Sequence, residues 1–273
     1  MSSLPRIDIH CHAFHPKIAS KVCEQLQDYY QMKASGTALW EDLEPRLRQA
    51  HIQYATVLSA ATKKEQVEPA NHYAVTQVNF PGAIPFGTIH PDYEKPEEML
   101  AYLWDNGIRG IKLHPDFQGF RLDDPRMDRV YAACEGRFVV LSHVGDRFPP
   151  EVNPSCPYKI AAIKRKYPKL QLIAAHFGGY RHWEHVVKAY EGLEIYMDTS
   201  SALFAIPQEL LEQIFKAFPR ERFLFGSDYP LGDCNHEIEL LQHRLKLTDN
   251  EIDQLMTNAN VFHLTEGRKP LDD

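Results

Sequence analysis

The sequence predicts a single (β/α)8 TIM barrel of the α/β class, spanning residues 1–273, with a helical insertion between strands 1 and 2. Short apolar runs alternate with helix-patterned segments about eight times, which is typical of parallel strands joined by helical crossovers. No Gly-x-Gly-x-x-Gly motif follows the first run, which argues against a dinucleotide-binding sheet. The expected strands are residues 6–10, 55–58, 84–89, 108–113, 138–142, 171–175, 194–197 and 222–225.

The segments between these strands carry apolar residues at helical spacing. Gly107, Gly136 and Gly192 each follow such a segment and precede a strand, as a glycine that ends a helix does. The long connection between residues 12 and 55 predicts two helices near the mouth of the barrel. The other expected helices are residues 125–135, 158–167, 181–191, 207–218 and 236–245, while residues 17–33 form the first helix of the insertion.

Composition narrows the class of protein. The net charge is −7, from 30 basic and 37 acidic residues, so nucleic acid is not an expected partner. The sequence has no apolar stretch long enough for a membrane span and no signal-peptide pattern. Five scattered cysteines without a Cys-x-x-Cys pair indicate reduced thiols. We therefore expect a cytoplasmic enzyme that acts on a small molecule, with a homodimer as a possible assembly.

Histidines and one aspartate stand where the expected strands end. His10 and His12 are two residues apart on the first strand, so both side chains are expected to face the barrel axis while Cys11 faces the helices. The fifth strand ends at His143, the sixth at His176, and Asp228 follows the eighth. The carboxyl ends of barrel strands share one rim, where active sites form.

A single histidine at a strand end is usually an ordinary hydrogen-bonded residue, and an aspartate after Gly-Ser is usually a turn residue. The combination of several imidazoles and a carboxylate on one rim is a stronger signal. Burying these polar groups together costs free energy unless they are compensated, and a divalent metal ion compensates them. The sequence therefore predicts metal binding.

Four segments together resemble the amidohydrolase superfamily, and most closely its amidohydrolase-related (amidohydrolase-2) branch of metal-dependent hydrolases and decarboxylases. They are Asp8-Ile9-His10-Cys11-His12, His143-Val144-Gly145, His176-Phe177-Gly178-Gly179 and Gly226-Ser227-Asp228-Tyr229-Pro230, and they occur in the family order. The resemblance implies that His10, His12, His143 and Asp228 bind a single ion, most simply Zn²⁺. It implies that His176 is an acid/base or orients water, or binds a second ion in binuclear members.

In binuclear members a carbamylated lysine or a glutamate on the fourth strand bridges the two ions, and Lys112 stands at about that place. A lysine that pairs within the barrel, or that binds a substrate carboxylate, is the preferred interpretation. His114 has the same strand parity as Lys112 and, like His90, is expected either to line the pocket or to be structural. Asp198 is expected to form hydrogen bonds at the rim.

The loops after the strands are expected to bind the substrate. The candidates are Phe14, Arg147 and Tyr229, with Lys112 and His114. His15, Phe117, Phe148 and Tyr180 are further candidates. Arg121, Arg147 and Arg181 could each bind a substrate carboxylate, but they are weaker candidates, because a surface arginine more often forms a salt bridge.

We expect a hydrolase that cleaves an amide, lactone or ester-like bond in a small, carboxylate-bearing substrate. Asp228 would accept the proton of the attacking water and His176 would assist. The alternative is a metal-dependent decarboxylase, a lyase, acting on an unsaturated or aromatic acid. Histidinol-phosphatase-like and TatD-like barrels fit less well, because Tyr229-Pro230 follows Asp228 and Lys112 replaces a glutamate. A non-catalytic scaffold is the least favoured interpretation.

Overall fold

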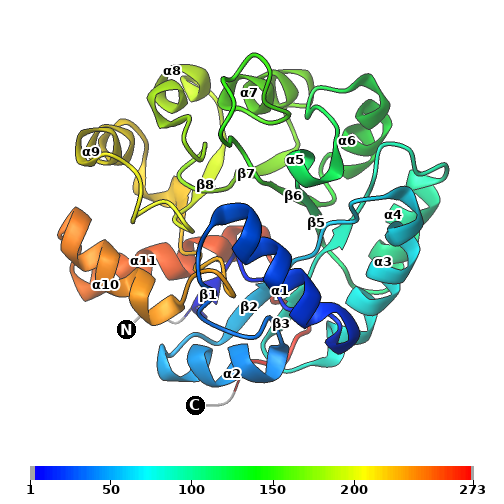
Figure 1. The fold of residues 1–273 in the computed structure, drawn as a ribbon, viewed down its shortest axis with the longest axis horizontal. Helices are drawn as coiled ribbons and strands as arrows, with labels where there is room; N and C mark the ends of the chain where they lie inside the picture. The colour runs from blue at the N-terminus through cyan, green and yellow to red at the C-terminus, as the bar shows by residue number, and fades with distance from the viewer. Residues whose placement is uncertain (1–3, 272–273) are drawn as a thin grey trace.

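Eight parallel strand positions form a barrel surrounded by helices in the computed structural model, which describes residues 4–271 (Figure 1). One ladder has the order β1-β2-β3 and the other β4-β5-β6-β7-β8-β9. Backbone hydrogen bonds from Ile9 N to Phe225 O (2.9 Å) and from Asp228 N to His10 O (2.7 Å) join the ends of β1 and β9. The strands are β1 (Ile7–Asp8), β2 (Tyr54–Val57), β3 (Ala83–Pro85), β4 (Gly87–Thr88), β5 (Gly110–Leu113), β6 (Val139–Ser142), β7 (Gln171–Ala174), β8 (Tyr196–Asp198) and β9 (Phe223–Leu224).

β3 and β4 are two halves of one strand, interrupted at Phe86, whose N–H bonds to Val57 O at 3.1 Å. The predicted barrel is therefore confirmed, including the insertion between its first two strands. That insertion consists of α1 (Pro16–Tyr30) and α2 (Trp40–Gln49). Figure 1 shows α1 lying across the face of the barrel rather than in the outer ring of helices.

The remaining α-helices follow the strands as crossovers or close the chain. They are α3 (Val67–Thr76), α4 (Pro96–Asp105), α5 (Pro115–Gln118), α6 (Asp128–Cys134), α7 (Pro157–Lys166), α8 (Val186–Tyr190), α9 (Gln208–Ala217), α10 (Cys234–Leu245) and α11 (Asp249–Thr257). Short 3-10 helices cover Lys64–Gln66, Gln77–Asn79, Pro125–Met127, Trp183–His185, Arg220–Arg222 and Asn258–Phe262. Two of them form the first turns of the helices expected at 125–135 and 181–191, which are therefore shorter as α-helix than expected.

The strands divide the apolar core into two layers. Val139 and Leu141 belong to a cluster inside the barrel, whereas Val140 between them packs in the layer of strands and helices. This is the alternation of side chains along a strand. Ile7 and Ile9 also lie in the interior cluster, so β1 turns its odd-numbered residues inward at this level.

The alternation of inward and outward side chains along the first strand breaks directly after Ile9. The backbone N–H of His10 donates to Asp8 Oδ1 at 3.1 Å, and the same oxygen accepts the N–H of Ser227 at 3.1 Å. Beyond this turn of the backbone, His10 and His12 line the cavity at the barrel mouth, while Cys11 packs in the outer layer. The expected direction of the two histidines and of Cys11 is thus observed.

All five cysteines are buried and free, as the scattered spacing predicted. Within residues 4–271, every helix is too short or too polar to cross a bilayer.

Gly110 of β5 leaves the space that the Phe86 ring occupies inside the barrel. A Cβ atom at Gly110 would lie 2.3 Å from Phe86 Cε1, and the Phe86 side chain is fully buried. We expect Gly110→Ala to lower the free energy of unfolding by about 1–3 kcal/mol through overpacking, measured by chemical denaturation. Phe86→Leu should relieve part of this cost, so the two substitutions should couple by at least about 0.5 kcal/mol. Strictly additive effects would contradict this account of the packing.

Candidate metal centre and active-site cavity

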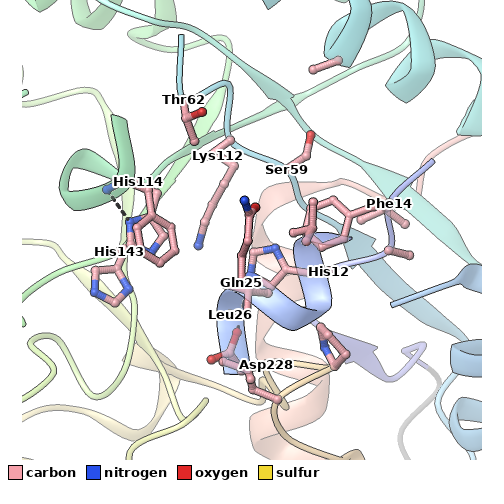
Figure 2. A pocket seen from close by; sticks show the side chains of 18 of the residues that line it. His12, Phe14, Gln25, Leu26, Ser59, Thr62, Lys112, His114, His143 and Asp228 are labelled. Carbon is pink, nitrogen blue, oxygen red and sulfur yellow. Dashed lines mark hydrogen bonds and ion pairs between the residues drawn. The ribbon is translucent and has the colours of Figure 1, made fainter. Parts of the chain in front are cut away.

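A cavity of about 820 Å³ opens at the carboxyl ends of the strands. Its floor is formed by residues from the strand ends, among them His12, Lys112 and Asp228, and α1 and α3 form its walls. Figure 2 shows these side chains converging on a common space, with Gln25 and Leu26 of α1 facing them.

Three predicted ligands meet on this floor. Asp228 Oδ1 lies 3.5 Å from His10 Nε2 and 3.4 Å from His12 Nε2, and one ligand atom of each residue falls within 4.8 Å of the others. His10 is almost fully buried, and the His12 side chain is 15% exposed, on the cavity side. The first and the last strand thus bring together residues more than 200 positions apart in the sequence.

The other ring nitrogen of each of these two histidines is already occupied. His10 Nδ1 donates to Asp198 Oδ2 at 2.9 Å, and His12 Nδ1 donates to Leu58 O at 3.0 Å. These contacts leave both Nε2 atoms with lone pairs directed at Asp228, as metal-binding histidines require. Burial lowers the pKa of His10 and of His12, which favours the neutral, ligating form.

Asp228 is held ionised. Burial alone would raise the pKa of its carboxyl group, but the neighbouring His10 and His12 imidazoles hold it below its usual range. Its second oxygen, Oδ2, accepts a hydrogen bond of 2.5 Å from Ser201 Oγ. A buried carboxylate between two neutral imidazoles is a strong attractor for a cation.

His143 and His176 lie beside this group and contact each other. His143 Nδ1 is 2.9 Å from His176 Nε2, His143 Nε2 is 2.8 Å from Gly145 O, and His176 Nδ1 is 2.9 Å from Ser200 O. Three hydrogen atoms are needed for these contacts, whereas two neutral rings supply only two. If His143 binds an ion, as the resemblance implies, one of these contacts is given up and one fewer hydrogen atom is needed.

Lys112 is buried against the same group. Its Nζ donates to His10 Nε2 at 3.0 Å, and the residue is 1% exposed. Burial lowers the pKa of Lys112 to about 8, opposed by the charges of Asp228 and Asp198. The ammonium group therefore occupies the polar floor itself, beside the candidate ligands.

The remaining predicted substrate residues divide into two groups. Phe14 and His114 line the cavity, and the His114 ring stacks on that of His143 with centroids 4.0 Å apart. Arg147 and Tyr229 are absent from the cavity lining within residues 4–271. The Arg147 guanidinium lies 4.4 Å from the centre of the Tyr29 ring, and the fully buried Tyr229 hydroxyl donates to Asp42 Oδ2 at 2.7 Å.

The weaker candidates also have other partners. Arg121 pairs with Asp123 at 2.9 Å, and Arg181 lies 5.3 Å from the centre of the Tyr180 ring. His90 Nε2 donates to Gln118 O at 3.1 Å, which gives it a structural contact. His15, Phe117 and Tyr180 line the cavity, whereas Phe148 is an exposed side chain elsewhere.

Several residues that shape the site were missed in the sequence. Asp198 forms hydrogen bonds at the rim, as expected, but the sequence did not show that its partners are His10 Nδ1, His176 N and Ser200 N. Ser200 and Ser201 follow it directly, and a polar run after a strand was the available signal. The cavity walls from α3 had no such signal, because apolar helix residues are usually core.

The residues present fit a divalent ion. Two other sets of histidines and aspartates also have ligand atoms close together, but their atoms are already engaged. His10 and His176 share Asp198 through hydrogen bonds, and both oxygens of Asp116, near His114 and His143, accept from Asn153 and Ser155. Among these sets, His10, His12 and Asp228 combine two Nε2 atoms that face one ionised carboxylate. His10 Nε2 also accepts a hydrogen bond from Lys112 Nζ, which a bound ion would replace.

A barrel with histidines on its first strand, an aspartate after its last strand and a cavity between them defines the class of metal-dependent barrel enzymes. The family model described as Amidohydrolase matches residues 7–258. The chain belongs to the amidohydrolase family and is a metal-dependent enzyme, either a hydrolase or a carboxy-lyase.

Solved structures support the fold. An uncharacterized TIM-barrel protein from Bordetella bronchiseptica has a TM-score of 0.75 and 16% identity, covering 97% of this chain and 100% of its own. Dihydroxybenzoic acid decarboxylase from Polaromonas sp. JS666, with bound manganese and 2-nitroresorcinol, has a TM-score of 0.69 and 13% identity, covering 96% and 97%. 4-Oxalomesaconate hydratase from Rhodopseudomonas palustris has a TM-score of 0.65 and 16% identity, covering 94% and 95%. No curated protein sequence matches the chain.

The contact between Asp198 and His10 should set the affinity for metal. We expect Asp198→Asn to weaken binding of Zn²⁺ or Mn²⁺ about 10–100-fold, because the neutral amide supports the His10 ring less strongly than a carboxylate. Competition with a chromophoric chelator measures the change. Asp146→Asn is the matched control, since Asp146 is equally buried but bonds to the Tyr29 hydroxyl. Equal affinity in wild type and Asp198→Asn would remove Asp198 from the support of the site.

Proposed function

We propose that this protein is a metal-dependent hydrolase that cleaves an amide, lactone or ester-like bond at a single divalent ion held by His10, His12 and Asp228, with His143 and His176 completing the site. The observation that carries the proposal is the pair of imidazole Nε2 atoms that face one ionised carboxylate at the floor of an open cavity. Zn²⁺ suits this nitrogen and oxygen donor set, and Mn²⁺ is the second candidate.

A divalent ion at such a site supplies Lewis acidity, which makes water a better nucleophile and a carbonyl carbon more electrophilic. Asp228 takes up the proton of the attacking water, because its carboxylate is ionised and adjoins the cavity. Ser201 fixes the orientation of the Asp228 carboxylate through Oδ2. His176 orients the water or returns the proton to the leaving group.

Lys112 and His114 face the substrate from the strand ends, and Phe14 contacts it from the start of the insertion. The Lys112 ammonium is the buried cation of the cavity floor. We assign it the role of binding an anionic or carbonyl oxygen of the substrate, with carbamylation of this lysine as the alternative that a binuclear site would require.

The second candidate function is decarboxylation of an unsaturated or aromatic acid. It is favoured by the names of structural neighbours, which include dihydroxybenzoic acid decarboxylase and 2,6-dihydroxybenzoate decarboxylase. Lys112 would then pair with the carboxylate that leaves, or with a neighbouring hydroxyl. The same residues serve both reactions, so the products must distinguish them.

We expect metal-loaded protein to hydrolyse members of a panel of lactones, amides and aryl esters, measured by pH-stat titration for the lactones and esters and by release of the amine for the amides. Asp228→Asn should lower turnover at least about 100-fold, because it removes the proton acceptor together with a ligand charge. A chelator should abolish activity, and added metal should restore it. Carbon dioxide release from unsaturated or aromatic acids, without hydrolysis of the panel, would replace the hydrolase by the decarboxylase. Full activity of Asp228→Asn would exclude the proposed mechanism.

A further inference from the structure

The cavity is much larger than the reacting group requires. Its volume of about 820 Å³ lies in the upper part of the range of about 300–1,000 Å³ for pockets that bury a drug-sized ligand. The metal ligands and Lys112 occupy only its floor at the strand ends. The rest of the cavity is available to parts of the substrate that do not react.

The chemistry of the lining changes from the floor to the walls. The side chains that α1 and α3 contribute are mainly apolar. The two helices meet at the start of α1, where the His15 ring packs edge-on against the Tyr73 ring of α3 with ring centroids 4.8 Å apart. The apolar wall residues are Ile18, Val22, Leu26, Pro69, Ala70, Tyr73 and Ala74.

Two wall residues expose apolar surface to solvent. Ile18 of α1 and Phe204, in the loop after β8, both line the cavity and are each 48% exposed. Large apolar side chains left in water at the edge of a pocket gain free energy when an apolar ligand covers them. Both residues therefore indicate that an apolar part of the substrate extends to the mouth.

Cationic groups are scarce along the walls. Within residues 4–271 no arginine lines the cavity, and the only lysine besides Lys112 is Lys17, an exposed residue in the first turn of α1. An ionised carboxylate placed among the apolar walls would lose its hydration without a buried partner. The cavity thus accepts negative charge at its floor and not along its walls.

We infer that the substrate is an elongated, largely apolar compound with one polar reacting group, such as a medium-chain acyl ester, amide or alkyl-substituted lactone. This inference rests on the proposed function for the identity of the reacting group, but the apolar portion follows from the walls alone. The reacting group sits on the floor beside Lys112, and the apolar portion lies between α1 and α3. A second carboxylate at the far end of the substrate is disfavoured.

Binding of unreactive analogues tests the inference without turnover. Metal-loaded protein is titrated by calorimetry with the saturated acids from butanoate to dodecanoate. Affinity should rise about fourfold per added methylene until the walls are covered, because each buried methylene contributes a constant increment. Octanoate should bind at least tenfold more tightly than the dicarboxylate suberate. Affinity that is independent of chain length, or stronger binding of suberate, would overturn the inference.

Substitutions in the walls locate the apolar portion. Ala70→Trp should change the affinity for butanoate less than twofold and lower the affinity for decanoate at least tenfold, because the indole ring fills the space between α1 and α3. Ala101→Trp is the matched control on the exposed surface of α4, outside the cavity, and should change neither affinity.

Ile18→Ser changes a half-exposed position, where folding should tolerate a polar side chain. It should lower the affinity for decanoate several-fold and leave the affinity for butanoate unchanged. Loss of butanoate and decanoate binding in equal proportion in Ile18→Ser would contradict the placement.

The outcome separates this inference from the proposed function. If the affinity for acids depends on chain length, and the wall variants alter this dependence, the substrate class is supported. If the same protein hydrolyses none of the panel, the hydrolase is rejected. Metal-dependent hydrolysis restricted to short esters, with no chain-length dependence of binding, supports the hydrolase and rejects the substrate class.

Discussion

The buried carboxylate of Asp198 is the contact on which the site depends. It stands at the end of β8 and bonds to the His10 ring from the first strand and to the backbone of His176 after β7. One side chain therefore fixes the relative positions of three strand ends. Because His10 Nδ1 bonds to Asp198, its Nε2 faces Asp228 and Lys112. The orientation of one candidate ligand is thus set by an anion that does not belong to the candidate ligand set.

The charges on the cavity floor also follow from this arrangement. Asp228 is an ionised carboxylate, the buried Lys112 ammonium lies beside it, and burial lowers the pKa of His10 and of His12. A divalent cation bound there would make the floor positive, and the floor would then attract an anionic or carbonyl oxygen of a substrate. The affinities for metal and for substrate would therefore be coupled through the charge of the floor.

The sequence predicted the barrel and the strand ends well, because both depend on local patterns. Period-2 alternation placed His10 and His12 on one side of their strand, although it could not show that the alternation breaks at Ile9, where Asp8 bonds to the His10 N–H. The sequence also could not predict that His143 and His176 contact each other through ring nitrogens, because this contact depends on the rotamers of the two side chains. The metal role of these two residues stays a prediction.

Substrate residues were harder to predict than candidate ligands, because a loop position does not say which way a side chain turns. Tyr229 directly follows Asp228, yet its hydroxyl reaches Asp42 of α2 and joins the insertion to the end of β9. Arg147 stacks on Tyr29, a residue of α1. Both side chains stabilise the position of the insertion instead of lining the cavity. Their contacts follow from where α1 and α2 lie, and the strand pattern carries no information about that.

The residues proposed for the reaction and the residues that shape the cavity walls come from different parts of the chain. The strand ends supply the candidate ligands, the proton acceptor and Lys112, all fixed by the barrel, whereas α1 closes one side of the cavity and faces α3 across it. A change in α1 can alter the size and polarity of the walls without moving His10, His12 or Asp228. Because fold alone does not set function, relatives with the same barrel and different insertions can act on different substrates. For this chain the walls are apolar, and it is they, rather than the metal ligands, that define which molecule reaches the site.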